Sequence, residues 1–290
     1  MKKVIAILCL GVLWFPVASW AQLQPPNEMG VAMGHVHLNV RDVEANKKFW
    51  GLMGGTPLKI DGTEVMKFPG VFIFLTPGMP PDGGGPPANL QVICGCPADG
   101  FEPSVINHLG FLVRDFDAYM AKFKAAGLTL KGIPGTGRRQ ILVFSPDNEA
   151  LEVAEGKTIA TPIADQHFHL FVPAFLPGNP HRVPAFAMYA WYNQMFGAKL
   201  NTDGTLGAVI PGMNMRFSPS MLPTLPTKGR TVDHIGLEVK NLEQFCKKLE
   251  ANGVKFDKPY SKTRHASFAS AELTDPWGIS LELTEGLNKF

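Results

Sequence analysis

The sequence predicts an α+β fold made of four consecutive βαβββ units, two units to a domain. Two observations carry this prediction. Sequence blocks recur in the same order in both halves of the chain, and each His-led strand pattern is followed by an amphipathic helical pattern. The composition fits such a fold, because 45% of the 290 residues are hydrophobic and 18% are charged, which provides for a substantial core.

The recurring blocks are short but keep their order. The first is H-x-H-L-x-V, at residues 35–40 and again at residues 167–172. The second pairs INHLGFLV at 106–113 with VDHIGLEV at 232–239, and the third pairs SPDNEALEV at 145–153 with DPWGISLEL at 275–283. A duplication of a two-unit segment is the simplest explanation.

Each His-led strand precedes a predicted helix that ends at a glycine, as helices commonly do. The helices are expected from near Asp42 to Gly54, from Asp115 to Gly127, from about residue 185 to Gly197, and from Asn241 to Gly253. Short strand-like runs follow each helix, for example residues 63–68 and 71–76.

The first residues have the pattern of a secretory signal peptide. Lys2 and Lys3 precede an apolar run over residues 4–17, and Ser19 and Ala21 supply the small residues of a cleavage site after Ala21. An uncleaved anchor is the alternative, but the run is short for a spanning helix, which needs about 20 residues. We therefore expect residues 1–21 to be removed and the mature protein to be secreted or periplasmic, with no membrane attachment after cleavage.

Charge and cysteine content exclude other classes. The formal charge of +2 gives no support to nucleic-acid binding. The cysteines of the mature chain, Cys94, Cys96 and Cys246, do not form a disulfide framework. Cys246 has the spacing of a core residue on its helix. The Cys94 and Cys96 pair lacks a second pair with which to hold a metal, so a loop or strand end is the preferred interpretation.

The His-led strands and the block D-P-W-G-I-S-L-E-L resemble the vicinal oxygen chelate superfamily. This superfamily includes glyoxalases, bleomycin-resistance proteins, fosfomycin-resistance proteins and extradiol dioxygenases. The resemblance implies two glyoxalase-like domains, each with a curved mixed sheet around a cleft, at residues 31–156 and 164–286. Residues 156–163 are then the linker between the domains.

The resemblance also implies two metal sites, each with two imidazoles and one carboxylate. Position by position, it assigns His35, His108 and Glu152 to the first site, and His167, His234 and Glu282 to the second. Such a set suits a divalent ion, Fe²⁺, Zn²⁺ or Mn²⁺, and leaves positions open for substrate. Hydrogen-bonded structural histidines and merely polar glutamates are the alternative. The recurrence of all three ligand types favours metal, with the second site closer to the family pattern.

Further histidines and arginines are candidates around these sites. His37 and His169 lie two residues after a predicted ligand, on the same strand face, and His265 precedes a ligand strand. Each is a candidate general acid or base, or else a hydrogen-bonded structural residue. Arg138, Arg139 and Arg264 are candidates for an anionic substrate, although they are more typical of solvated loops.

The sequence departs from the named branches at specific positions. The fourth ligand of glyoxalases falls on Phe74 and Arg216, which argues against lactoylglutathione lyase activity. Where extradiol dioxygenases have a Tyr, this chain has Glu272 in the second half and Leu142 in the first, which argues against classical ring cleavage.

We therefore expect an exported, metal-dependent enzyme that acts on a small oxygen-rich molecule, by dioxygenase, lyase or isomerase chemistry. A non-catalytic protein that sequesters a small molecule is the alternative with the same fold. Two Pro-rich stretches fit either function: residues 173–184 are a candidate cover for the second cleft, and residues 77–87 are a candidate flexible loop.

Overall fold

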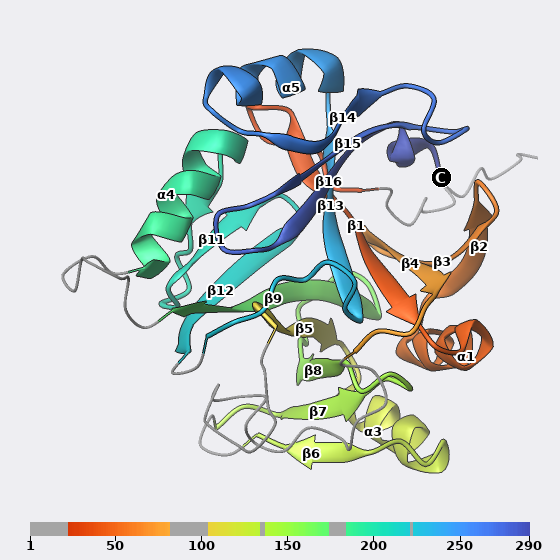
Figure 1. The fold of residues 1–290 in the computed structure, drawn as a ribbon. Coiled ribbons are helices and arrows are strands. Elements are labelled where there is room, and N and C mark those ends of the chain that lie inside the picture. The colour runs from red at the N-terminus through yellow and green to blue at the C-terminus, as the bar shows by residue number, and fades with distance from the viewer. Residues whose placement is uncertain (1–22, 82–103, 134–136, 174–183, 221–222) are drawn as a thin grey trace, which may run out of the picture.

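A computed structural model describes residues 23–81, 104–133, 137–173, 184–220 and 223–290 (Figure 1). The predicted signal peptide, the pair Cys94 and Cys96, and most of the stretches 77–87 and 173–184 lie outside these residues. Within them the chain forms two mixed eight-stranded sheets with helices, which confirms the predicted α+β class with two glyoxalase-like sheets.

The strands of the two sheets follow in spatial order. The first sheet contains β14 (Phe256–Ser261), β15 (Ala269–Thr274), β16 (Ser280–Glu285), β13 (Val232–Val239), β1 (Val31–Val40), β4 (Val71–Pro77), β3 (Thr63–Phe68) and β2 (Thr56–Ile60). The second contains β10 (Lys199–Leu200), β11 (Gly207–Ile210), β12 (Met213–Ser220), β9 (Ile163–Pro173), β5 (Ile106–Val113), β8 (Ala150–Glu155), β7 (Gln140–Phe144) and β6 (Leu130–Gly132).

The units pair across the two halves of the chain, not within them. At the centre of the first sheet β1 pairs with β13 in antiparallel fashion, which joins the first unit to the fourth. At the centre of the second sheet β5 pairs with β9, which joins the second unit to the third. The predicted grouping into domains 31–156 and 164–286 is therefore wrong, and residues 156–163 connect β8 to β9 of one sheet instead of linking two domains.

The reason is that all four units begin with similar strands. A repeat shows that strands are alike, but antiparallel partners are selected by packing and by the reach of the connections. The connection from β8 to β9 is short and keeps the second and third units on one sheet. The longer stretch between β4 and β5 leads from the first sheet to the second, and the chain returns between β12 and β13.

The helices lie near their predicted positions and their ends have local causes. They are α1 (Val43–Met53), α3 (Phe116–Ala125), α4 (Pro184–Phe196) and α5 (Leu242–Ala251), with a 3₁₀ turn η1 (Leu287–Lys289). Asp42 and Asp115 cap α1 and α3 by accepting from backbone N–H groups of the first turn. At α5 the cap comes from another element, because Glu285 accepts from the backbone N–H groups of Asn241 and Leu242.

A continuous apolar core joins the two sheets. Trp50 of α1 is fully buried, and its ring lies 6.0 Å from that of Phe111 on β5, edge to face. Phe68 of β3 lies 5.6 Å from the same ring. Cys246 is buried in α5 with its apolar neighbours, as predicted. Contacts of this kind pack the two sheets against each other.

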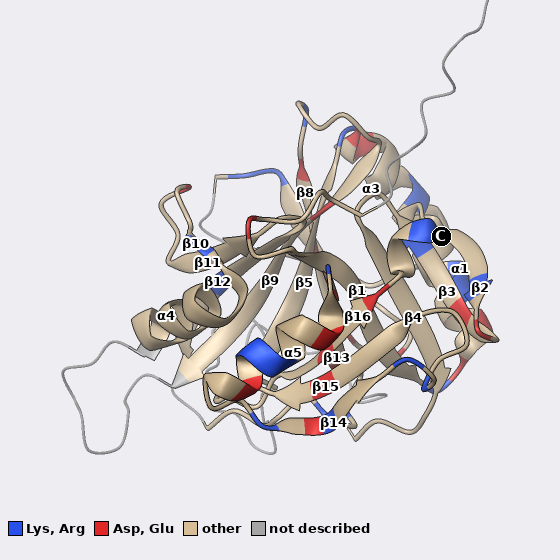
Figure 2. Ribbon diagram, turned by 90° about the horizontal axis from the view of Figure 1, so that it is seen from above, with Lys and Arg blue, Asp and Glu red and all other residues tan. Residues whose placement is uncertain are grey.

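The surface carries both charges. Figure 2 shows basic and acidic segments side by side along α5 and around α1 and β2. Among the described residues, no helix combines the length and hydrophobicity needed to cross a bilayer.

Candidate metal centres

Each sheet places its candidate ligands around one glycine of a central strand. In the first sheet Gly236 of β13 is paired with His35 of β1 on one side and with Glu282 of β16 on the other. In the second sheet Gly110 of β5 is paired with His167 of β9 and with Glu152 of β8. The side chains on the flanking strands converge above the glycine because nothing projects from it.

The space above each glycine is filled by an imidazole ring. A Cβ built on Gly236 would lie 2.0 Å from ring atoms of His35, and one on Gly110 would lie 2.2 Å from those of His167. In each H-x-G pattern, at 108–110 and 234–236, the histidine is one candidate ligand, and the glycine leaves the space that the ring of the other histidine occupies. The role of these glycines was not predicted from the sequence, although the repeated H-x-G pattern is a signal that indicates it.

The first sheet brings His35, His234 and Glu282 together; we call this cluster site A. The two imidazole Nε2 atoms lie 3.4 Å apart. Glu282 Oε2 lies 3.2 Å from His35 Nε2 and 3.4 Å from His234 Nε2. All three residues are buried, with relative exposures of 1%, 9% and 4%.

The second sheet brings His108, His167 and Glu152 together; we call this cluster site B. The Nε2 atoms of the two histidines lie 3.2 Å apart, and Glu152 Oε2 lies 3.5 Å from His108 Nε2. These residues are likewise buried. The six candidate ligands thus form two sets of two histidines and one glutamate.

The predicted assignment of ligands to the two sets is wrong in one respect. The resemblance groups His35 with His108 and Glu152, and His167 with His234 and Glu282. In the structure His35 lies with His234 and Glu282, and His167 lies with His108 and Glu152. The cause is the pairing of the first unit with the fourth and of the second with the third. Each set still contains two histidines and one glutamate, because each unit contributes the histidine of its first strand at the same position.

The spacing of the donor atoms fits a metal ion. Ligands at about 2.0–2.1 Å from a tetrahedral zinc lie roughly 3.3 Å from one another. The three donor pairs of site A lie 3.2–3.4 Å apart. Three nitrogens of His35, His37 and His234, and likewise of His108, His167 and His169, also lie within 4.8 Å of one another. The donor set and its spacing therefore fit a divalent cation.

The electrostatics favour neutral imidazoles at His35 and His167, as metal binding requires. Burial lowers the pKa of His35, and burial together with the neighbouring His108 lowers that of His167 well below its usual value. Burial raises the pKa of Glu282, but hydrogen bonds from three histidines outweigh it and hold the pKa well below the ordinary value. The carboxylate is therefore ionised.

The two sites differ in the residue that contacts Nδ1 of the β13 histidine in site A and of the β5 histidine in site B. In site A, His234 Nδ1 is 2.6 Å from the carboxylate of Asp233. Burial lowers the pKa of His234, but hydrogen bonds to Asp233 and Glu282 outweigh it and raise the pKa to about 9. In site B, His108 Nδ1 is 2.6 Å from the amide oxygen of Asn107, which is uncharged. Carboxylate partners of this kind orient a ligand histidine and raise its basicity.

The three predicted acid–base histidines differ in their surroundings. His37 Nε2 lies 2.6 Å from Thr76 Oγ1, and His169 Nε2 lies 2.7 Å from Ser218 Oγ. Burial lowers the pKa of each to about 3, so these rings stay neutral, held by the hydroxyls of the neighbouring strands. His265 is the accessible one: its side chain is 31% exposed and its Nε2 lies 3.1 Å from Glu282 Oε1.

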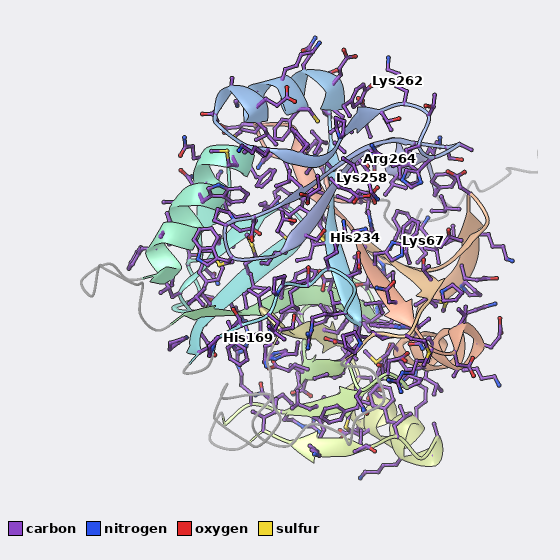
Figure 3. The ribbon with its side chains drawn as sticks, viewed as in Figure 1. Lys67, His169, His234, Lys258, Lys262 and Arg264 are labelled. Atoms are coloured by element: carbon purple, nitrogen blue, oxygen red, sulfur yellow. The ribbon has the colours of Figure 1, made fainter. Side chains whose placement is uncertain are left out.

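The arginine candidates are mostly occupied elsewhere. Arg139 forms ion pairs with Asp117 and Glu155. Arg264 donates to the carbonyl and hydroxyl of Ser270. Arg138 is exposed, and its charge acts on His167. Figure 3 shows Arg264 and Lys258 near the β14 edge, and His234 and His169 in separate parts of the molecule, one at each site.

Residues 184–283 match the profile of the Glyoxalase/Bleomycin resistance protein/Dioxygenase superfamily, a stretch that contains α4 and both site-A ligands of the fourth unit. Over these residues the chain is similar to that superfamily. The match confirms the resemblance inferred from the His-led strands and from the block at 275–283.

Solved structures share the whole architecture. Glyoxalase I from Zea mays superposes with a TM-score of 0.62 at 12% identity, covering 89% of this chain and 94% of that one. A protein of Bacillus subtilis subsp. subtilis str. 168 described as a "putative dioxygenase" has a TM-score of 0.57 at 13% identity, covering 92% and 86%. At such identities the likeness establishes the fold. A comparison with curated proteins found no match.

Proposed function

We propose that this protein is an exported, divalent-metal-dependent enzyme that acts on a small oxygen-rich substrate. One observation carries the proposal: in site A, two imidazole nitrogens and one carboxylate oxygen lie 3.2–3.4 Å from one another on three different strands. Such close approach of a carboxylate and buried rings, repeated at site B, is typical of a ligand set.

The residues in and around site A would have separate roles in binding the ion and in moving a proton. His35, His234 and Glu282 would hold the ion, which would polarise adjacent substrate oxygens when bound. His265 is placed to move a proton, because it is partly exposed and contacts the ligand carboxylate. The ring of Phe268 stacks on His265 at 4.1 Å and fixes its orientation.

The residues around site A are charged on one side and apolar on the other. Glu272 is directly opposite Glu282 across β15 and β16, and it forms ion pairs with Lys258 and Lys228. Phe74 lies 4.8 Å from His35 and forms the apolar side. A small molecule with both oxygens and an apolar part suits this arrangement.

The residues at the position of the fourth glyoxalase ligand limit the reaction types that the two sites can support. Glyoxalase I and the dioxygenase-like neighbour suggest isomerase or oxygenase chemistry for the scaffold. The position of the fourth glyoxalase ligand is Phe74 in site A and Arg216 in site B, neither of which binds a cation. We therefore infer a reaction that needs three protein ligands and open positions on the ion. Sequestration of a small molecule without catalysis is the competing function.

The experiment compares metal content in matched variants. Wild type, Glu282→Ala, Glu152→Ala and the surface control Glu243→Ala are purified without chelators, dialysed and analysed by mass spectrometry. We expect one metal per chain fewer in each of the first two variants and no loss in the control. Full metal content in both ligand variants would refute the proposal. Oxygen uptake and substrate screens on the loaded protein then separate the enzyme from the sequestering protein.

Export is the remaining part of the proposal. It is supported by Lys2 and Lys3, the apolar run and the cleavage pattern ending at Ala21. N-terminal sequencing of the protein recovered from a periplasmic fraction should start at Gln22. Recovery of the full-length chain from the cytoplasm would contradict it. The expected partner is the small-molecule substrate, with no nucleic acid and no membrane.

A further inference from the structure

Sites A and B are built from equivalent positions, but one equivalent pair has opposite character. β4 pairs with β1 so that Phe74 is opposite His37, and β12 pairs with β9 so that Arg216 is opposite His169. Phe74 lies against the site-A histidines. Site B therefore has a guanidinium on the wall where site A has a phenyl ring.

The side chain of Arg216 is directed to the site side of its sheet. Met215 and Phe217, its neighbours on β12, are buried in the apolar core on the opposite face. The pKa of His167 and that of His169 are lowered by burial, by His108 and also by the charge of Arg216, which places this charge close to both rings.

Arg216 is incompletely paired. Its side chain is 13% exposed and its Nη2 lies 3.4 Å from Asp203, a carboxylate that is itself 39% exposed. Its Nε is buried and has no hydrogen-bond partner among the described residues. A guanidinium presents its donors as a fork that fits carboxylate and phosphate oxygens, and buried donors are rarely left unpaired.

The charge balance also separates the two sites. A divalent ion in site A would face Glu282 and, behind His234, Asp233, which together cancel its charge. In site B it would face Glu152, with neutral Asn107 behind His108 and with Arg216 beside it, a cation whose charge the partly exposed Asp203 offsets only in part. Site B with a bound ion is therefore left with a positive excess that an anion can neutralise.

We propose that site B binds an oxyanion group of a small molecule, a carboxylate, phosphate or phosphonate, through Arg216 and the adjacent ion, and that site A does not. This inference rests on the proposed function for the ion, but the guanidinium and its free donor belong to the chain itself. The two sites then accept different ligands, and Arg216 is the residue that determines the specificity of site B.

The test isolates each site in the full chain. Glu282→Ala leaves site B and Glu152→Ala leaves site A. Each variant is titrated with inorganic phosphate by calorimetry, once metal-free and once loaded with Co²⁺, whose visible spectrum reports ligands that enter its coordination. With cobalt bound, we expect phosphate to bind the Glu282→Ala protein and perturb its cobalt spectrum. We expect it to bind the cobalt-loaded Glu152→Ala protein at least about tenfold more weakly, because Arg216 acts there without an adjacent ion.

Variants of Arg216 in the Glu282→Ala background decide its role. Arg216→Gln should weaken phosphate binding at least about tenfold while cobalt stoichiometry is retained. Arg216→Lys, which keeps the charge, should bind phosphate more tightly than Arg216→Gln. The matched control Arg139→Gln, with an arginine paired to surface carboxylates, should leave phosphate affinity unchanged. Far-UV circular dichroism checks that each variant is folded.

The outcomes separate this inference from the proposed function. Phosphate binding that is equal at the two sites, absent from site B or indifferent to Arg216 would overturn the inference, even with cobalt bound normally. Failure of either site to take up cobalt would overturn the proposed function. In that event the metal-free titration still decides, because Arg216-dependent phosphate binding would support the anion site and its absence would refute it.

Discussion

Replacing Gly236 by alanine should remove the metal from site A without touching a ligand. The added Cβ would lie 2.0 Å from Cε1 and Nδ1 of His35. Ordinary contacts between such atoms are about 3.5 Å, so the ring must move by about 1.5 Å. Metal–ligand bonds tolerate deviations of roughly 0.2 Å, so His35 can no longer bind the ion. Outer-shell mutations weaken metal binding by about 10–100-fold, and loss of a ligand should exceed about 100-fold.

The assay is a competitive zinc titration in the Glu152→Ala background, where only site A remains. Overpacking should cost about 1–3 kcal/mol of stability, which a folded domain tolerates and a melting curve detects. Gly51→Ala is the matched control, since a Cβ at this helical position meets nothing within 4 Å. Gly110→Ala should have the same effect on site B, where His167 lies 2.2 Å from the added atom. Unchanged zinc affinity in Gly236→Ala would refute the steric reasoning.

Three further predictions concern charge and metal. Asp233→Asn should lower zinc affinity at site A by about 10–100-fold, because His234 Nδ1 loses its carboxylate partner at 2.6 Å. An unchanged zinc affinity would show that Asp233 does not support His234 as a ligand. Burial raises the pKa of Asp275 to about 6, although hydrogen bonds from Tyr192 and from backbone N–H groups act to lower it. Between about pH 4 and 6, the native state therefore keeps a proton on Asp275 that the unfolded chain releases. Stability should then fall by at most about 3 kcal/mol as pH rises from about 4 to 6, and Asp275→Asn should flatten that slope in urea titrations; parallel curves would contradict this. Removing metal with a chelator should lower the melting temperature, because an ion that binds the native state alone stabilises it, and identical melting curves would refute metal binding.

Much of the fold follows from local sequence. The His-led strands, the helices that begin after Asp42 and Asp115, and the D-P-W-G turn are specified by alternation, capping and turn chemistry. In that turn Asp275 Oδ1 accepts from the backbone N–H groups of Trp277 and Ile279, and Gly278 adopts φ +91°, which glycine allows. These local interactions start the strand that carries Glu282.

The sequence predicted which residues belong to the candidate sites, but not which of them share a site. Every one of the six candidate ligands lies in one of the two clusters, because each repeated block carries its ligand at a fixed position. The partners were mistaken because the repeat makes all first strands alike. Strand registers alone reveal the space that Gly110 and Gly236 leave for a histidine ring, and the position of the largely buried Arg216 beside site B.

The sequence by itself determined the units, their order, and the ligand types that each unit supplies, since these depend on residues close together in the chain. The tertiary structure decided which units share a sheet, and therefore that His35 meets His234 and Glu282 while His108 meets His167 and Glu152. The physical reason is that strand partners are selected by packing between distant segments, in which similar strands compete and only the complete core distinguishes them.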